Sequence, residues 1–151
     1  MLKIRITSHY LLFAIFLVIQ QPASFAAETP QTILKAWADA YATRSGDALA
    51  VVYAKDAHLW GTVSKEPTIG IEQIKEYFEK GGQSVNVRSV TFGKTNTVLR
   101  TDSAFISGQY QFSATMKDGS PRETAARFSL ALVKDGDTWR IVDHHSSALP
   151  K

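Results

Sequence analysis

The spacing of the apolar residues changes once along this chain, at Gly81-Gly82, and this change constrains the fold more than any other feature. Before it, Ile33, Leu34, Trp37 and Tyr41 recur three and four residues apart, as on one stripe of a helix. After it, apolar and polar residues alternate with a period of two, which is typical of strands. Helices followed by strands predict an α+β fold rather than a parallel doubly wound sheet.

The helical half is expected to hold three elements. Thr29-Pro30 supplies a capping hydroxyl and a proline at the first helical position, and the first helix is expected to end at Ser45-Gly46, where the glycine takes the left-handed conformation. Asp47 is expected to cap a second, shorter helix. A third helix begins after Gly70 and stops at the glycine pair.

Short polar links separate the later strands. Residues 117–121 and 134–137 each contain an Asp-Gly pair, which favours hairpin turns. Consecutive antiparallel pairing is therefore the simplest topology. The expected strands cover residues 85–90, 97–100, 104–115, 124–133 and 138–146, after a short extended segment at 56–61.

The first residues of the chain have the pattern of a targeting segment. Lys3 and Arg5 precede an apolar run from Leu11 to Ile19, and small residues follow as far as Ala26. We expect a signal peptide over residues 1–26, a single domain over 27–151, and a periplasmic or secreted protein. The apolar run is shorter than the roughly 18 residues that span a bilayer, so no membrane attachment is expected after cleavage; an uncleaved anchor is the alternative.

Charge and cysteine content exclude several classes of function. The chain has 17 Lys and Arg against 14 Asp and Glu, and removing a leader that contains Lys3 and Arg5 leaves 15 against 14. With no basic stripe, no nucleic-acid partner is expected. The absence of cysteine excludes thiol catalysis and thiolate metal sites, so one domain of about 125 residues must be held together by packing.

The chain ends on the sequence WRIVDHHSSALPK, which invites a catalytic or metal-binding interpretation. Adjacent residues of a strand point to opposite faces, so His144 and His145 cannot bind one metal ion together, and we expect no metal site and no cofactor. Strict alternation places Asp143 and His145 on the face of Trp139, and His144 on the other face, at a subunit contact. No Gly-x-Ser-x-Gly elbow accompanies the serines, so a serine hydrolase is not expected.

The strand from Ala126 to Leu132 has an apolar face and a face of small residues interrupted by Arg127. Apart from Arg127, the strand carries no charged residue. This indicates that helices cover one face of the sheet and a partner subunit the other, which predicts a homodimer through the sheet; an ordinary exposed face is the alternative. A buried guanidinium needs an anionic partner. Arg127 is therefore expected to pair with Asp143 or Glu123, or with the carboxylate of a ligand.

Several short motifs occur together in an order typical of one superfamily. They are Trp37 with Tyr41, Ser45-Gly46-Asp47, Asp56-Ala57 before Leu59-Trp60-Gly61, Gly70-Ile71, and Trp139 to Val142. In this order they resemble the SnoaL-like bacterial members of the nuclear transport factor 2-like superfamily. The resemblance implies a cone of N-terminal helices on a curved, mostly antiparallel sheet with an internal cavity.

The end of the chain resembles the association-domain family of calcium/calmodulin-dependent protein kinase II. This resemblance rests on Arg127, on Asp137-Thr138-Trp139, and on His145-Ser146-Ser147 with Pro150. It implies that Arg127 lines a polar cavity, whereas that family's second cavity arginine is replaced here near Tyr110. Bacterial relatives are more often dimers than large rings.

These observations lead to an exported module that binds a small anionic molecule or assembles as an oligomer, without established catalysis. The alternatives are a SnoaL-like lyase or isomerase that uses Asp143 or His145 as acid and base, and an inhibitor or immunity-type protein that acts through its surface. Core packing is the alternative role for the tyrosines, and a hydrogen-bonded position at the cavity rim for His145. The candidate ligand-binding residues are Arg127, Tyr41, Tyr53, Trp60, Tyr77, Tyr110 and His145.

Overall fold

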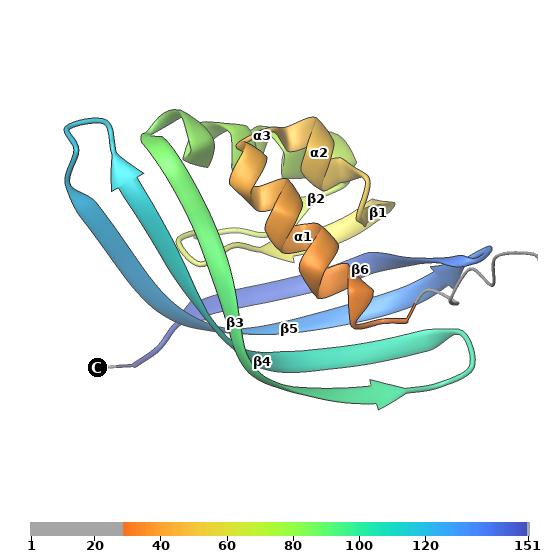
Figure 1. Ribbon diagram of the computed structural model, residues 1–151. Helices are drawn as coiled ribbons and strands as arrows, with labels where there is room; N and C mark the ends of the chain where they lie inside the picture. The colour runs from red at the N-terminus through yellow and green to blue at the C-terminus, as the bar shows by residue number, and fades with distance from the viewer. Residues whose placement is uncertain (1–28, 151) are drawn as a thin grey trace, which may run out of the picture.

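A computed structural model describes residues 29–150 (Figure 1). The expected leader and its cleavage site lie outside these residues. Within the described part, no helix is long and apolar enough to cross a membrane. The three helices of this part are α1 (Thr32–Thr43), α2 (Gly46–Ala50) and α3 (Ile71–Gln83).

The turn between α1 and α2 differs from the expectation in two ways. Arg44, not a glycine, takes the left-handed conformation that ends α1, with φ 66°. Its side chain compensates by donating a hydrogen bond to the carbonyl of Val85, 2.9 Å away. The cap of α2 is Ser45 rather than Asp47, because the Ser45 hydroxyl accepts the backbone N–H of Ala48.

The described strands form one six-stranded sheet in the order β2-β1-β6-β5-β4-β3. All neighbours pair antiparallel except β1 and β6, which are parallel. Both predicted hairpins are present, and the two segments expected at 85–90 and 97–100 are one continuous strand. The strands are β1 (Tyr53–Trp60), β2 (Thr68–Ile69), β3 (Val85–Leu99), β4 (Ser103–Met116), β5 (Pro121–Asp135) and β6 (Thr138–Ala148).

The sheet curves around the helices, and the long strands β3 and β4 bend most strongly (Figure 1). The bend coincides with an irregularity in their pairing between Phe92 and Thr95. Opposite it lies Gly108, where a Cβ atom would lie 2.7 Å from the carbonyl oxygen of Lys94. Only glycine allows the two backbones to approach this closely, so the curvature has a local cause in the sequence.

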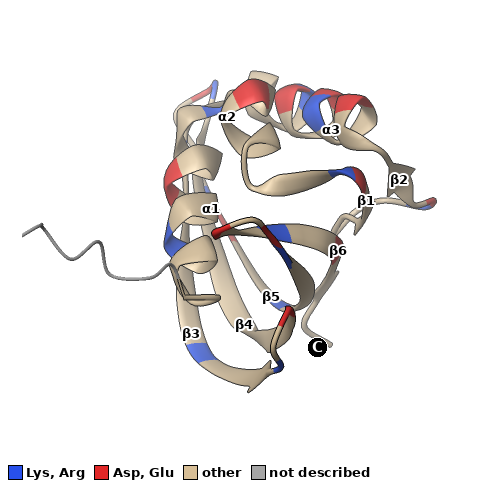
Figure 2. Cartoon of the chain, turned by 90° about the vertical axis from the view of Figure 1, so that its right-hand side faces the viewer, with Lys and Arg blue, Asp and Glu red and all other residues tan. Residues whose placement is uncertain are grey.

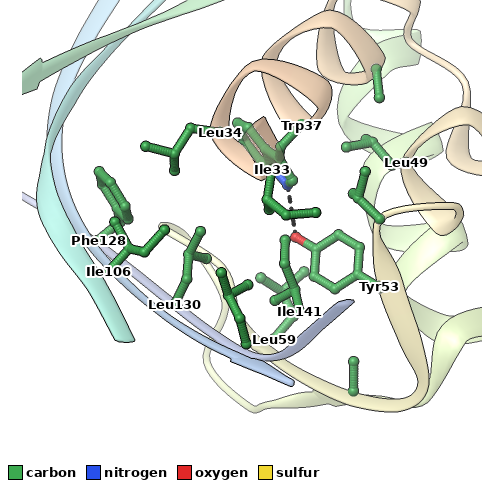
Figure 3. Packing of buried hydrophobic residues seen from close by; sticks show 14 of the residues in the cluster. Ile33, Leu34, Trp37, Leu49, Tyr53, Leu59, Ile106, Phe128, Leu130 and Ile141 are labelled. Atoms are coloured by element: carbon green, nitrogen blue, oxygen red, sulfur yellow. Dashed lines mark hydrogen bonds between the residues drawn. The ribbon is translucent and has the colours of Figure 1, made fainter. Parts of the chain in front are cut away.

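The core lies between α1, α3 and the concave face of the sheet. Ile33, Leu34 and Trp37 of α1 point toward sheet residues such as Ile106 and Leu130 (Figure 3). Each fully buried aliphatic side chain stabilises the fold by about 1.5–3 kcal/mol relative to an exposed one. This packing confirms the predicted helical stripe and the predicted α+β cone.

Charged residues gather on the outer surfaces of α2 and α3, whereas the sheet carries few of them (Figure 2). Lys75 of α3 contacts Asp47 of α2 at 2.7 Å and Glu72 of its own helix at 3.3 Å. Exposed pairs of this kind contribute little to stability.

Candidate ligand-binding site

A cavity of about 340 Å³ lies between the helices and the concave face of the sheet. Its walls are largely aromatic, and the ring of Trp37 stacks on that of Tyr41 with centroids 5.2 Å apart. The cavity has the size and apolar character of small-molecule sites. The aromatic side chains that line it are Trp37, Tyr41, Tyr77, Phe78, Tyr110 and Phe112.

A β-bulge at Val142 determines which residues of β6 face the cavity. In the pairing with β5, Ile141 lies opposite Leu132 and Asp143 lies opposite Ala131, so Val142 has no partner. One extra residue shifts the alternation of faces by one position. The buried residues of β6 are accordingly Trp139 and Ile141 before the bulge, and His144 and Ser146 after it.

The face predicted for the two histidines is therefore wrong. His144 is 3% exposed and lines the cavity, instead of lying at a subunit contact. Asp143 and His145 lie on the outer face, opposite Ala131 and Ser129 of β5. Neither of these two side chains lines the inner cavity.

A buried chain of hydrogen bonds ends at His144. The Trp37 Nε1–H donates to the hydroxyl oxygen of Tyr53 at 2.9 Å, and that hydroxyl lies 2.7 Å from His144 Nδ1. Burial, with a smaller effect of His145, lowers the pKa of His144 to about 3, and burial raises the pKa of Tyr53. Both side chains are therefore neutral at pH 7.

A second chain of hydroxyl groups lies beside the first. Tyr110 donates a hydrogen bond to Ser146 Oγ at 2.5 Å, and Ser146 Oγ is also hydrogen-bonded to Thr62. Burial raises the pKa of Tyr110, so its hydroxyl remains protonated. This part of the cavity wall presents neutral polar groups.

Another part of the cavity wall is cationic. Arg88 is 3% exposed, and its guanidinium donates to the carbonyls of Tyr41 and Phe78 at 2.6 and 3.0 Å. Its carbon Cζ lies 4.2 Å from the centroid of the Tyr41 ring. Nη2 is buried and has no hydrogen-bond partner within residues 29–150. Burial lowers the pKa of Arg88, which means that its charge is costly at this position.

A second arginine lies at the same level of the sheet, two strands away from Arg88. Arg88 of β3 is opposite Ala114 of β4, which is opposite Arg122 of β5, and all three residues line the cavity. Lys80 of α3 also lines it. Lys80 forms a salt bridge with Glu76 of its own helix at 2.6 Å. No Asp or Glu is among the described residues of the cavity wall, and no described carboxylate forms a salt bridge with Arg88 or Arg122.

The structure brings together part of the predicted ligand-binding set. Tyr41, Tyr77 and Tyr110 line the cavity, and Tyr53 lies behind it, in contact with His144. Trp60, 40% exposed, lies at the outer end of β1 opposite His145.

Arg127 does not line the inner cavity. It is exposed on the outer face, in a shallow polar groove that also contains Lys94 and His145. Its Nε donates to Ser147 Oγ at 3.0 Å, and Glu123 accepts hydrogen bonds from Gln111 and Ser113 instead. Because side chains alternate along β5, Arg127 lies on the outer face, whereas its neighbour Phe128 lies on the face toward the helices.

The polar cavity residues that sequence reasoning missed include Arg88, Arg122, His144 and Ser146. Arg88 follows a second bulge, since Asn86 has no partner between the pairs of Val85 and Val87 with β4. Strict alternation would place Arg88 outward, so no local signal identified it. Arg122 could have been found by extending the predicted strand by two residues, because it has the same parity as Thr124 and Phe128.

The described residues contain no group of three or more His, Cys, Asp or Glu that could hold a metal ion. The chemistry available in the cavity is therefore that of cations, neutral hydrogen-bond donors and aromatic rings.

The comparisons with known proteins agree with this architecture. Residues 31–150 match the model of the SnoaL-like domain. A protein from Xanthomonas campestris, provisionally named a calcium/calmodulin-dependent protein kinase II association domain, is 33% identical; the match covers 80% of this chain and 86% of that one, with a TM-score of 0.75. No curated protein matches this chain.

More distant structures share the fold alone. A nuclear transport factor 2-like superfamily protein from Salmonella enterica is 17% identical, with a TM-score of 0.71 over 80% of this chain and 88% of that one. A protein from Streptomyces avermitilis, provisionally named a dehydratase of the same family, is 9% identical, with a TM-score of 0.72 over 80% and 94%. The chain thus belongs to the SnoaL-like domain family and shares the fold of nuclear transport factor 2-like proteins.

Proposed function

We propose that this protein binds a small organic anion with an aromatic body in the inner cavity. The observation that carries the proposal is Arg88, a buried guanidinium that lines a cavity without a described carboxylate and forms no salt bridge with a described residue. A buried charge without an opposite charge is costly. The carboxylate of a ligand in the cavity would compensate this charge, and the planar guanidinium suits it geometrically.

The second arginine and the aromatic walls support the same class of ligand. Arg88 and Arg122 lie at the same level of the sheet, on β3 and β5, with β4 between them. The two strands are about 10 Å apart. Both side chains can therefore approach one anionic group. The aromatic side chains of the wall, among them Tyr77 and Phe112, offer apolar contact to an aromatic ring. The ligand is therefore an aromatic carboxylate or a compound of similar shape and charge.

The ionisation of the cavity groups favours binding over catalysis. A general base at neutral pH needs a pKa close to 7. His144, with a pKa of about 3, is a poor base, and Tyr110, with a raised pKa, is a poor acid. The alternative of a lyase or isomerase that uses Asp143 or His145 has no support from the geometry, since both lie outside the inner cavity.

Export and dimerisation remain part of the proposal. The leader pattern of residues 1–26 favours a periplasmic or secreted protein. For the homodimer, the support is the outer face of the sheet, where Ser107 and Ser129 are directly opposite each other. The large side chains of Trp60 and Phe105 are exposed, at 40% and 46%. Small central residues allow a second copy to approach, and the aromatic residues would be buried.

The proposal is tested by calorimetric titration of the purified protein with benzoate and with benzamide. The two compounds have nearly the same shape, and only benzoate carries a charge. We expect benzoate to bind and to raise the melting temperature, and benzamide to bind at least tenfold more weakly. Equal binding of the two compounds, or no binding of benzoate and of larger aromatic carboxylates, would contradict the proposal.

A further inference from the structure

The hydrogen bonds behind His144 determine which of its ring nitrogens carries the proton. The indole N–H of Trp37 is only a donor, so the Tyr53 oxygen accepts it. The hydroxyl proton of Tyr53 then has His144 Nδ1 as its acceptor. A proton on Nδ1 instead would leave the buried Tyr53 hydroxyl proton without an acceptor, at a cost of about 1–3 kcal/mol.

The remaining proton of the neutral imidazole is therefore on Nε2. This nitrogen makes no hydrogen bond with any described residue, and it is not one of the buried unpartnered atoms of that part of the chain. His144 lines the cavity. Nε2–H is thus a donor that a molecule in the cavity can reach.

A series of ring contacts connects the cationic group with the donor. Arg88 packs on Tyr41 at 4.2 Å, Tyr41 stacks on Trp37 at 5.2 Å, and Trp37 meets the His144 ring edge-on at 5.4 Å. Arg88 and His144 line the same cavity, so a molecule with its carboxylate at Arg88 can extend toward His144.

We propose that His144 is a specificity-determining residue, which selects anions that carry a hydrogen-bond acceptor, such as a carbonyl oxygen, at the end remote from the carboxylate. The inference rests on the proposed function, because it assumes that the carboxylate is bound at Arg88. Trp37 and Tyr53 are positioning residues, since they act through the tautomer of His144. A site with a fixed donor disfavours a ligand that leaves this donor unpaired.

The tautomer is tested first, without any ligand. In a long-range ¹H–¹⁵N NMR spectrum of the histidine side chains, His144 is expected as the neutral form with its proton on Nε2 at pH 7. In the Tyr53→Phe variant, Nδ1 loses its donor, and we expect a mixture of the two tautomers. A charged His144, or a proton on Nδ1 in the wild-type protein, would overturn the inference.

The selectivity is tested with two probes of matched shape, 4-acetylbenzoate and 4-isopropenylbenzoate. The first has a carbonyl oxygen where the second has a methylene group. We expect 4-acetylbenzoate to bind the wild-type protein about tenfold more tightly, which corresponds to one hydrogen bond. The His144→Phe variant should bind both probes equally, whereas the matched variant His145→Phe on the outer face should retain the preference.

The outcomes separate this inference from the proposed function. Equal binding of the two probes to the wild-type protein would overturn the role of His144 and leave the anion site in place. No binding of either probe would overturn both. Should His144→Phe fail to fold, Tyr53→Phe replaces it, and there an even mixture of the two tautomers would lower the preference to about fivefold; an unchanged tenfold preference would overturn the inference.

Discussion

Four consecutive residues of β6 provide a direct comparison of the two faces of the sheet. His144 and Ser146 point inward and are 3% and 6% exposed, whereas His145 is exposed and Ser147 half-buried on the outer face. The inner pair bonds to the buried hydroxyls of Tyr53 and Tyr110. The outer pair lies in an open groove beside Arg127. Identical residue types thus have different chemistry on the two faces.

Two arginines show the same difference between the inner and the outer face of the sheet. Arg88 is buried against Tyr41 and has an unpaired nitrogen, while Arg127 is exposed and donates to a serine. In both comparisons the inner residue follows a bulge in its own strand, at Asn86 or at Val142. The bulges therefore determine which charged and titratable groups the cavity contains.

His144→Lys should have the largest effect, because it places an unpaired cation at a buried position and removes the hydrogen bond to Tyr53. We expect the free energy of unfolding, measured in urea, to fall by more than about 4 kcal/mol. His145→Lys is the matched change on the outer face and should cost less than about 0.5 kcal/mol. Similar losses in the two variants would contradict the assignment of the two histidines to opposite faces.

Acidification should have the next largest effect. The pKa of His144 is about 3 in the folded protein and 6.5 in the unfolded chain, so below pH 6.5 the unfolded chain binds a proton that the folded protein does not. Stability is complete above pH 6.5 and is lost as the pH falls toward 3. Between pH 7 and pH 5 the loss from this residue is about 2 kcal/mol.

Thermal unfolding as a function of pH measures this loss. The His144→Asn variant should be less stable at pH 7 but should lose about 2 kcal/mol less between pH 7 and pH 5. The matched variant His145→Asn should keep the steep dependence. If His145→Asn removes the dependence and His144→Asn does not, the two faces have been assigned the wrong way round.

A smaller effect is expected for the rim arginine. Arg122→Gln should weaken the binding of benzoate about fivefold, or ~1 kcal/mol, because the lost contact is charged but partly screened by solvent. Arg127→Gln, which removes the same charge from the outer face, should leave the dissociation constant unchanged. Titration calorimetry at one ionic strength compares them, and equal weakening would place the anion elsewhere than in the inner cavity.

The smallest effect on the cavity is expected from Ser129→Glu on the outer face. This exposed substitution should change stability and benzoate affinity by less than about 0.5 kcal/mol. Light scattering should nevertheless show the mass fall from that of a dimer to that of a monomer, because the added charges would meet in the interface. A monomeric wild-type protein would contradict the predicted homodimer.

Thr124→Glu is the matched change on the inner face of the same strand. Thr124 lines the cavity, one inward position along from Arg122. The new carboxylate should compete with benzoate for the arginines and abolish binding, while the mass of the protein stays the same. Loss of the oligomer in this variant rather than in Ser129→Glu would reverse the roles of the two faces.

Much of the fold could be predicted because its signals are local. The apolar stripe of Ile33, Leu34 and Trp37, and the Asp-Gly pairs of the two hairpins, each depend on neighbouring residues only. The left-handed end of α1 at Arg44 was harder to predict. The Arg44 side chain donates to the carbonyl of Val85, which is 41 positions away in the sequence.

The sequence by itself thus determined the element types, their order, the antiparallel hairpins and the tyrosines as cavity candidates. Only the tertiary structure decided that Arg88 and His144 point inward and that Arg127 and His145 point outward. The physical reason is that strand parity is reset by a single unpaired residue. Whether such a residue is present depends on the register of the neighbouring strand and on the packing of both faces, which no window of local sequence contains.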